Sequence, residues 1–363
     1  MVVSMSGTGR VPKFIFLLAF LMVGGTTVHA KVHDQVCSAC HTMHYSQGGL
    51  PLSEWGIRGP YKALLVNDCV GCHTGKNTES TKTPYILTPE SEIVYGATGT
   101  ETTSNTLAGG NFWWVYDGNS KRFDAKGHNV EGIALEDETL HNAPPGGTDM
   151  KHRLTCAGTY GCHGDRAVVG VLESMMGAHH ADDSTIDGSS VGKSYRFLNG
   201  IVGLEDPDWE YRPTNTEHNQ YKGIDRSDEQ NFDPTTISHL CAECHGDFHF
   251  GNDISSGSWG SPWLRHPTDY DMGHTASNSE YRNYPGPYGQ QGDYSVVAPV
   301  ASENVTEVKS SVKFDKDTII TCITCHRAHG TPYWKLLRWD YFGWPTDKED
   351  DTNGCMACHS AKN

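Results

Sequence analysis

The sequence predicts a chain of mostly coil, with short α-helices and little β-structure, folded around a core that its own apolar side chains do not supply. Only 36% of the 363 residues are hydrophobic and the mean hydropathy is −0.52, which excludes a multi-span membrane protein. The 40 Gly and 17 Pro are typical of many turns and few long helices. The 12 Cys and 20 His indicate what else is buried.

The charge balance excludes one class of function. Lys and Arg number 28 against 44 Asp and Glu, and the net charge is −16. An acidic chain repels the phosphate backbone, so no nucleic-acid partner is expected.

The first 30 residues have the pattern of a secretory signal peptide. Arg10 and Lys13 form a basic start, residues 14–23 are an apolar run, and Ala30 ends a small-residue cleavage site. Ten apolar residues are too few to cross a bilayer. We therefore expect a signal peptide over 1–30 and a single domain over 31–363. No transmembrane segment is expected after the signal is removed.

All 12 cysteines fall into one pattern of six motifs. Five motifs are C-x-x-C-H, and in the sixth, Cys156 and Cys162, five residues separate the thiols. C-x-x-C-H is typical of c-type haem attachment. The sequence therefore predicts a multihaem cytochrome c with six covalently bound haem c groups, held by these pairs: Cys37 and Cys40, Cys69 and Cys72, Cys156 and Cys162, Cys241 and Cys244, Cys322 and Cys325, Cys355 and Cys358.

The spacing has a physical reason. Positions i, i+3 and i+4 share one face of a helical turn, so two thiols reach one porphyrin while the next imidazole reaches its iron. We expect Asp233 and Asp317 to cap the turns before two of the motifs, and a helix over 168–178. The expected proximal ligands are the histidines that end the motifs: His41, His73, His163, His245, His326 and His359.

Other uses of the motifs are disfavoured. A disulfide framework does not explain a histidine after each second cysteine. Zinc sites would lack a fourth ligand in every motif, and thioredoxin-like pairs do not come in sixes. The stretched motif leaves an alternative open: Gly158 and Gly161 allow its extra residues to bulge, but a Cys156–Cys162 disulfide without haem would reduce the count to five.

The remaining histidines outnumber the irons, which favours bis-histidine irons suited to electron transfer. Some stand one turn beyond a proximal ligand and could reach a neighbouring haem, and His179 and His180 follow the expected helix. His152 and His239 lie shortly before motifs, where a hydrogen bond is the simpler role. The set expected as distal ligands is His44, His128, His180, His249, His266 and His329.

Several local sequences resemble a known family. They include Cys40-His41-Thr42-Met43-His44, residues 126–129 (KGHN), residues 264–267 (LRHP) and residues 325–329 (CHRAH). With the number and order of the motifs, they resemble the filament-forming hexahaem cytochromes on the outer surface of metal-reducing bacteria. The resemblance is weak over 165–235.

The resemblance implies haems stacked in a continuous chain, little regular secondary structure, and electron transport to extracellular acceptors. It implies other cytochromes as partners, self-assembly into filaments, and an outer-surface location, with the periplasm second. It also implies that His44 ligates a haem of the next subunit; ligation within its own chain is the alternative.

We therefore expect an electron-transfer protein rather than an enzyme. The rival is a multihaem reductase of nitrite or sulfur oxyanions with one open haem, for which the stretched motif is the candidate place. A structural filament subunit is a third interpretation, compatible with the first.

Overall fold

The computed structural model describes residues 36–42, 46–47, 50–51, 61–226, 231–249, 266–343 and 353–361. The expected signal peptide and His44 lie outside these residues. Within them, no helix combines the length and the apolar character needed to cross a membrane.

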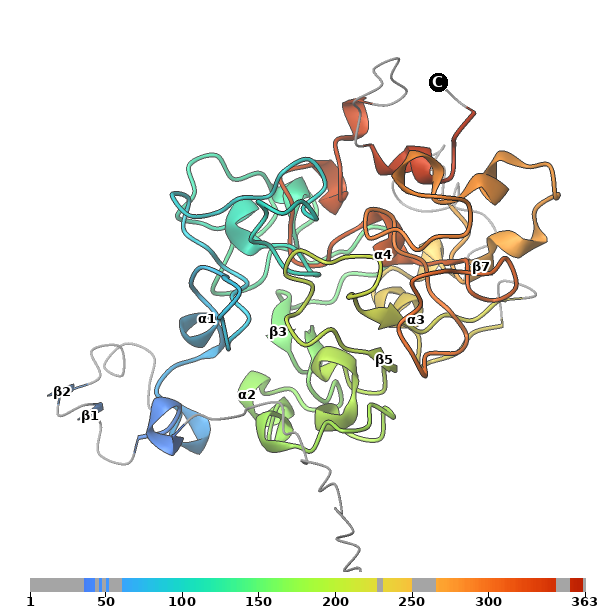
Figure 1. Ribbon diagram of the computed structural model, residues 1–363. Coiled ribbons are helices and arrows are strands. Elements are labelled where there is room, and N and C mark those ends of the chain that lie inside the picture. Colours follow the sequence, from blue (N-terminus) through green and yellow to red (C-terminus); the bar gives the residue numbers. More distant parts are fainter. Residues whose placement is uncertain are drawn as a thin grey trace, which may run out of the picture.

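Regular structure is sparse, as the sequence predicts (Figure 1). The α-helices are α1 (Cys69–Cys72), α2 (Val171–Ser174), α3 (Ile237–Ala242) and α4 (Cys322–Cys325). The strands are β1 (Ser46–Gln47), β2 (Leu50–Pro51), β3 (Thr155–Ala157), β4 (Gly161–His163), β5 (Gly203–Leu204), β6 (Gln220–Tyr221), β7 (Tyr270–Asp271) and β8 (Ile319–Ile320). The 3-10 turns are Cys37–Ala39, Lys62–Leu64, Phe112–Trp114, Asp124–Lys126, Ala178–His180, Val191–Lys193, Tyr195–Phe197, Gly246–Phe248, Met272–His274, Glu280–Asn283, Gly286–Tyr288, Trp334–Leu336, Tyr341–Gly343 and Gly354–Ala357.

The strands form four sheets of two strands each. The pairs β1–β2, β5–β6 and β7–β8 are antiparallel, with Ser46 opposite Pro51, Gly203 opposite Tyr221 and Tyr270 opposite Ile320. The β3–β4 pair is parallel, with Ala157 opposite His163. The β1–β2 pair lies apart from the other labelled elements, at one extremity of Figure 1. None of these two-stranded sheets is large enough to form one face of a hydrophobic core, so each only holds two short segments of the chain together.

Five of the six haem motifs lie on short helical turns, and the third lies on β3 and β4. The caps of α3 and α4 differ from those expected. Thr236 caps α3 by accepting from the His239 N–H, and Asp233 instead accepts from Thr235 one turn earlier. Thr321 forms a capping box with Thr324 at the start of α4, and Asp317 pairs with Lys309. The hydroxyls stand directly at the N-cap position, where a side chain reaches the first free N–H groups. The expected caps were therefore wrong. The expected helical turns are present at five motifs, whereas the stretched third motif is extended.

The helix expected over 168–178 was also wrong in length. Only α2, Val171–Ser174, is α-helical, and the 3-10 turn Ala178–His180 follows. The C-cap of α2 is Met175, and Gly177, at a left-handed φ of +77°, directly precedes the 3-10 turn. His179, which is half-buried, and His180, which is exposed, belong to this separate turn.

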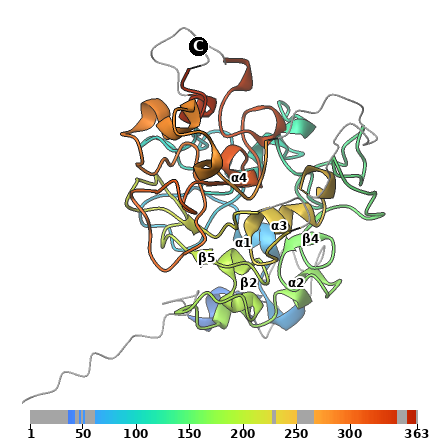
Figure 2. The ribbon, with the colours of Figure 1, turned by 90° about the vertical axis from the view of Figure 1, so that its right-hand side faces the viewer.

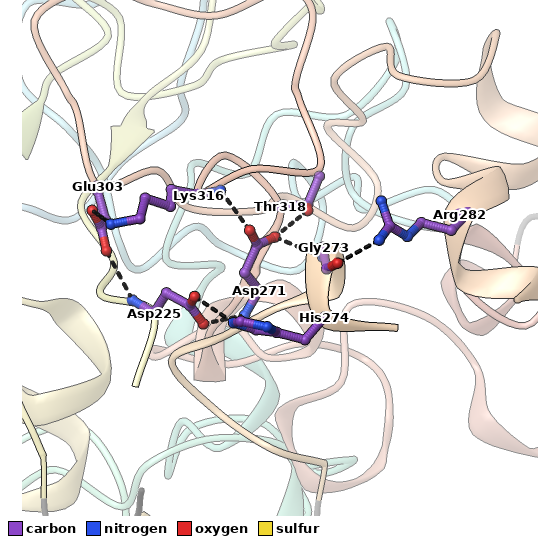
Figure 3. Close-up of polar contacts among 8 residues, drawn as sticks. All are labelled: Asp225, Asp271, Gly273, His274, Arg282, Glu303, Lys316 and Thr318. Atoms are coloured by element: carbon purple, nitrogen blue, oxygen red, sulfur yellow. Dashed lines mark hydrogen bonds and ion pairs between the residues drawn. The ribbon is translucent and has the colours of Figure 1, made fainter. Parts of the chain in front are cut away.

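A polar network ties the segment before α4 to the rest of the molecule (Figure 3). Asp271 in β7 accepts from the Gly273 N–H at 3.0 Å and from the Lys316 N–H and the Thr318 hydroxyl. Asp225 bonds His274 Nε2 at 2.5 Å and accepts from the Asp271 N–H at 3.1 Å. These bonds fix the β7–β8 pair, and therefore the start of α4.

The described apolar core is divided into three small clusters. Their centres include Ile319, Val300 and Ile133, each fully buried. Helices α3 and α4 pack together, and lie next to each other in both views (Figures 1 and 2). Residues of all three clusters, among them Leu240, Trp339 and Phe112, line the interior space that also contains most of the haem motifs.

Candidate functional site

One continuous cavity of about 3310 Å³ runs through the described part of the molecule. A pocket for a single small ligand measures about 300–1,000 Å³, so this space fits several large groups. Its walls carry ten of the 12 cysteines and five of the six motif histidines. The lining cysteines are Cys40, Cys69, Cys72, Cys156, Cys162, Cys241, Cys244, Cys322, Cys325 and Cys355.

The motif histidines are oriented by backbone carbonyl groups. In five of them Nδ1–H donates to a carbonyl oxygen 2.7–2.9 Å away. A carbonyl can only accept, so the proton is on Nδ1 and Nε2 keeps its lone pair for a metal. His359 Nδ1 lies 3.6 Å from Glu280 Oε1 instead. The five pairs are His41 with Ala63, His73 with Pro84, His163 with Arg196, His245 with Pro145, and His326 with Lys335.

In the first, third and fifth motifs the same type of backbone turn supplies the carbonyl that orients the histidine. Each acceptor starts a turn in which two consecutive residues have positive φ: Ala63–Leu64, Arg196–Phe197 and Lys335–Leu336. The second carbonyl of each turn accepts the N–H of the residue after the motif histidine, at 2.8–2.9 Å. The left-handed turn therefore points two consecutive carbonyls at one motif.

Five motif histidines face a second histidine across the cavity or its edge. The ring centroids lie 6.0–6.5 Å apart. By contrast, His218 packs directly on Tyr294 with centroids 3.7 Å apart. The facing pairs are His41 and His180 (6.1 Å), His73 and His179 (6.5 Å), His163 and His329 (6.2 Å), His245 and His128 (6.1 Å), and His359 and His266 (6.0 Å).

His179 is not in the set expected as distal ligands, although its ring faces that of His73. His179 and His180 are adjacent in the sequence, which gives no reason to prefer either as a ligand. In the structure His179 lies opposite His73, so the two histidines face different motifs. His249 lies elsewhere: it is 2% exposed, and its Nε2 is 2.9 Å from Asp269 Oδ2. Among the described residues, no histidine ring faces His326 at the spacing of the other five pairs. His44 lies outside the described residues.

Burial favours the neutral form of several of these histidines by lowering their pKa. It lowers the pKa of His128 to about 4 and that of His329 to about 3, with neighbouring histidines adding to both shifts. It also lowers the pKa of His73 and His163. A metal binds the neutral imidazole, so the burial favours ligation.

Consecutive motifs are neighbours in space along the whole chain. Burial raises the pKa of Cys72 and of Cys162 to about 11, and in each the thiol of an adjacent motif adds to the shift. Cys156 hydrogen-bonds with Cys69, which raises the pKa of Cys156. The neighbouring thiols are Cys40 and Cys72, Cys69 and Cys156, Cys162 and Cys244, Cys241 and Cys322, and Cys325 and Cys355.

The stretched motif has the donor set of the others. Its thiols are free and lie on the paired strands β3 and β4, and His163 is held by the same kind of turn as His41 and His326. Gly158, at φ +83°, makes the bulge, because a Cβ there would meet the Val168 carbonyl at 2.6 Å. The residues at all six motifs thus fit a c-type haem: two thiols and an oriented imidazole.

Comparisons with known proteins agree with these features. Residues 315–363 match the family model described as a doubled CXXCH motif. The chain is 25% identical to the C-type cytochrome OmcS of Geobacter sulfurreducens, over 84% of this chain and 78% of that protein.

Two solved structures are also similar. One is an outer membrane cytochrome S filament from Geobacter sulfurreducens, with 18% identity, a TM-score of 0.46, and coverage of 86% of this chain and 85% of that one. The other is the OmcS nanowire from the same organism, with 20% identity, a TM-score of 0.46, and coverage of 85% and 84%. By sequence similarity and the doubled motif, this chain resembles the multihaem c-type cytochrome OmcS.

Proposed function

We propose that this chain carries electrons through six covalently bound haems, each with two histidine ligands. The observation that carries the proposal is the set of five histidine pairs with centroids 6.0–6.5 Å apart. Two imidazoles that bind opposite sides of one metal ion, at the usual bond length of about 2 Å, have centroids roughly 6 Å apart. Direct aromatic packing explains one such pair but not a partner for each of five motif histidines.

Each residue type has a distinct role in this proposal. The cysteines hold the porphyrins covalently, and the motif histidines ligate the irons with Nε2 while a carbonyl or Glu280 orients the ring. His180, His179, His329, His128 and His266 supply the second ligands for the first, second, third, fourth and sixth motifs. The haem supplies the one-electron chemistry of its iron. The chain orients the haems and excludes water.

The order of the motifs gives the electron path. Each motif has a thiol beside a thiol of the next motif, from Cys40 and Cys72 at one end to Cys325 and Cys355 at the other. Haems bound at adjacent motifs are therefore adjacent themselves. The path runs through the molecule in sequence order.

A ligand for the haem of His326 that comes from another copy would produce self-assembly. No described histidine faces this ring, and the similar structures are a filament and nanowires by name. We propose that His44 of another copy completes this haem, and that export delivers the chain to the outer surface. Other cytochromes and extracellular acceptors would be its partners.

The same observation favours one alternative function. If no second ligand reaches His326, its haem keeps an open position and the chain is a reductase of nitrite or sulfur oxyanions. The open haem would then be at the fifth motif, since the stretched motif has the facing pair His163 and His329.

The test uses the full chain, exported and matured with haem. Intact mass should give residues 31–363 plus six haems. Electron paramagnetic resonance should show only low-spin iron in assembled protein. A mass with five haems refutes the count, and stoichiometric high-spin iron with rapid nitrite turnover in assembled protein establishes the reductase.

A further inference from the structure

Two buried arginines lie beside the fifth motif. Arg327 is 2% exposed and Arg338 is 1% exposed. Arg327 directly follows His326, and the Arg338 N–H donates to the Cys325 carbonyl at 2.9 Å. Both side chains line the central cavity. The backbone that holds the fifth motif therefore also places two positive charges in the interior.

Neither charge has a carboxylate partner in the described part of the chain. Arg327 donates to the carbonyls of Leu107, Ala108 and Thr98 at 2.7–3.2 Å. The Arg338 Nε–H donates to the Ile323 carbonyl at 2.8 Å, and its terminal nitrogens donate to no described acceptor. No described carboxylate oxygen lies within ion-pair distance of either guanidinium.

The nearby ionisable groups do not neutralise these charges. Burial raises the pKa of Tyr95, Tyr221 and Tyr294, so their hydroxyls are neutral. Glu210 acts on Arg327 from beyond ion-pair distance; its Oε1 accepts from the Asn219 N–H at 3.0 Å and the Tyr221 hydroxyl at 3.1 Å. A buried charge without a partner is strongly unfavourable, and no described carboxylate supplies the counter-ion for these two guanidinium groups.

A haem brings two carboxylates on its propionate side chains. We propose that Arg338 binds a propionate carboxylate of a haem in this cavity, and that Arg327 adds a second, backbone-anchored positive charge. The inference rests on the proposed haem-binding function. Arg338 has the free donors, and a guanidinium matches a carboxylate in two parallel hydrogen bonds.

The contact has a consequence for electron flow. Reduction adds a negative charge to a haem, and a fixed positive charge in a dry site favours it. Arg338 therefore raises the reduction potential of the haem whose propionate it binds, which makes that haem a preferred place for an electron along the path.

The test is a redox titration of the mature protein with the charge removed. In Arg338→Gln, one haem component should become about tenfold harder to reduce, which is 59 mV for one electron. All six haems should remain attached and low-spin. Arg282→Gln is the matched control: Arg282 also donates to a backbone carbonyl, that of Thr275, and does not line the cavity. It should leave every component unchanged.

If Arg338→Gln does not mature, Arg338→His at pH 8.5, where the imidazole is neutral, should show the same displaced component. An unchanged set of potentials in a variant with all haems attached overturns the inference. Absence of haem from the wild-type fifth motif would instead overturn the proposed function, and intact mass separates the two outcomes.

Discussion

His179 and His180 are consecutive residues that face different haem motifs. The ring of His179 lies 6.5 Å from that of His73, and the ring of His180 lies 6.1 Å from that of His41. The 3-10 turn Ala178–His180 directs adjacent side chains to different sides. One turn thus joins the first and second motifs.

Each of these two histidines should control a different iron. His179→Ala and His180→Ala should each keep six haems and convert one low-spin iron to high-spin, because each removes one ligand. The double variant should show two. His141→Ala is the control, since His141 pairs with Glu136 at the surface. Electron paramagnetic resonance measures the change, and a single shared high-spin site in the double variant would contradict the pairing.

His249 should affect stability rather than ligation. Its Nε2 is 2.9 Å from Asp269 Oδ2 in a buried pair. We expect His249→Gln to leave all irons low-spin and to lower the free energy of unfolding by about 1–3 kcal/mol, the cost of a broken buried hydrogen bond. Denaturant titration and visible spectra measure both effects. A new high-spin iron would restore His249 as a distal ligand.

The stretched motif should carry a haem. Cys162→Ala removes one of the two thiols of this motif. We expect five haems that are each attached by two thioether bonds, and a sixth haem that is either lost or attached by one bond. Denaturing mass spectrometry distinguishes these states from wild type. Cys244→Ala provides the comparison at a standard motif. Five haems in both wild type and Cys162→Ala would support the disulfide interpretation.

Polymer formation should depend on His44. If His44 ligates the haem of His326 in another copy, His44→Ala leaves six haems attached, makes one high-spin, and abolishes filaments, because head-to-tail contacts propagate only through that bond. Electron microscopy and spin state are read on the same sample. Filaments that persist with every iron low-spin would show that His44 has another role.

The stability should decline as the pH rises toward neutrality because of Asp206. Burial, with a contribution from Asp208, raises its pKa from 3.8 to about 7. Between these values the folded state holds a proton that the unfolded state has lost, so stability falls by up to about 4 kcal/mol, and by less where solvent screens the carboxylate.

Asp206→Asn should remove that decline, and the gain over wild type should grow from pH 4 to pH 7. The exposed Asp187, whose pKa its bonds with Ser189 lower, gives the control Asp187→Asn, which should show no trend in this range. Denaturant titrations at several pH values measure both. Parallel curves for wild type and Asp206→Asn would refute a shifted Asp206.

The sequence by itself predicted the character of this protein. A cysteine pair followed by a histidine predicts haem attachment from the local sequence alone. Its donor side chains lie within one short segment, so no contact with a distant residue is needed to bring them together. The low apolar fraction and the many glycines correctly predicted coil and short helices. Similarity to OmcS then agrees with the resemblance drawn from short motifs such as residues 126–129.

The tertiary structure decided how distant residues pair. His128 faces His245, and His329 faces His163. The members of each pair are far apart in the sequence, so no local pattern predicts that they meet. The proposal of His179 in place of His249 depends on the turn Ala178–His180, which follows Gly177, and on the buried carboxylate of Asp269 beside His249. The unpaired charge of Arg338 likewise became visible only once its surroundings were in place, because burial and the absence of a described counter-ion are properties of the folded chain.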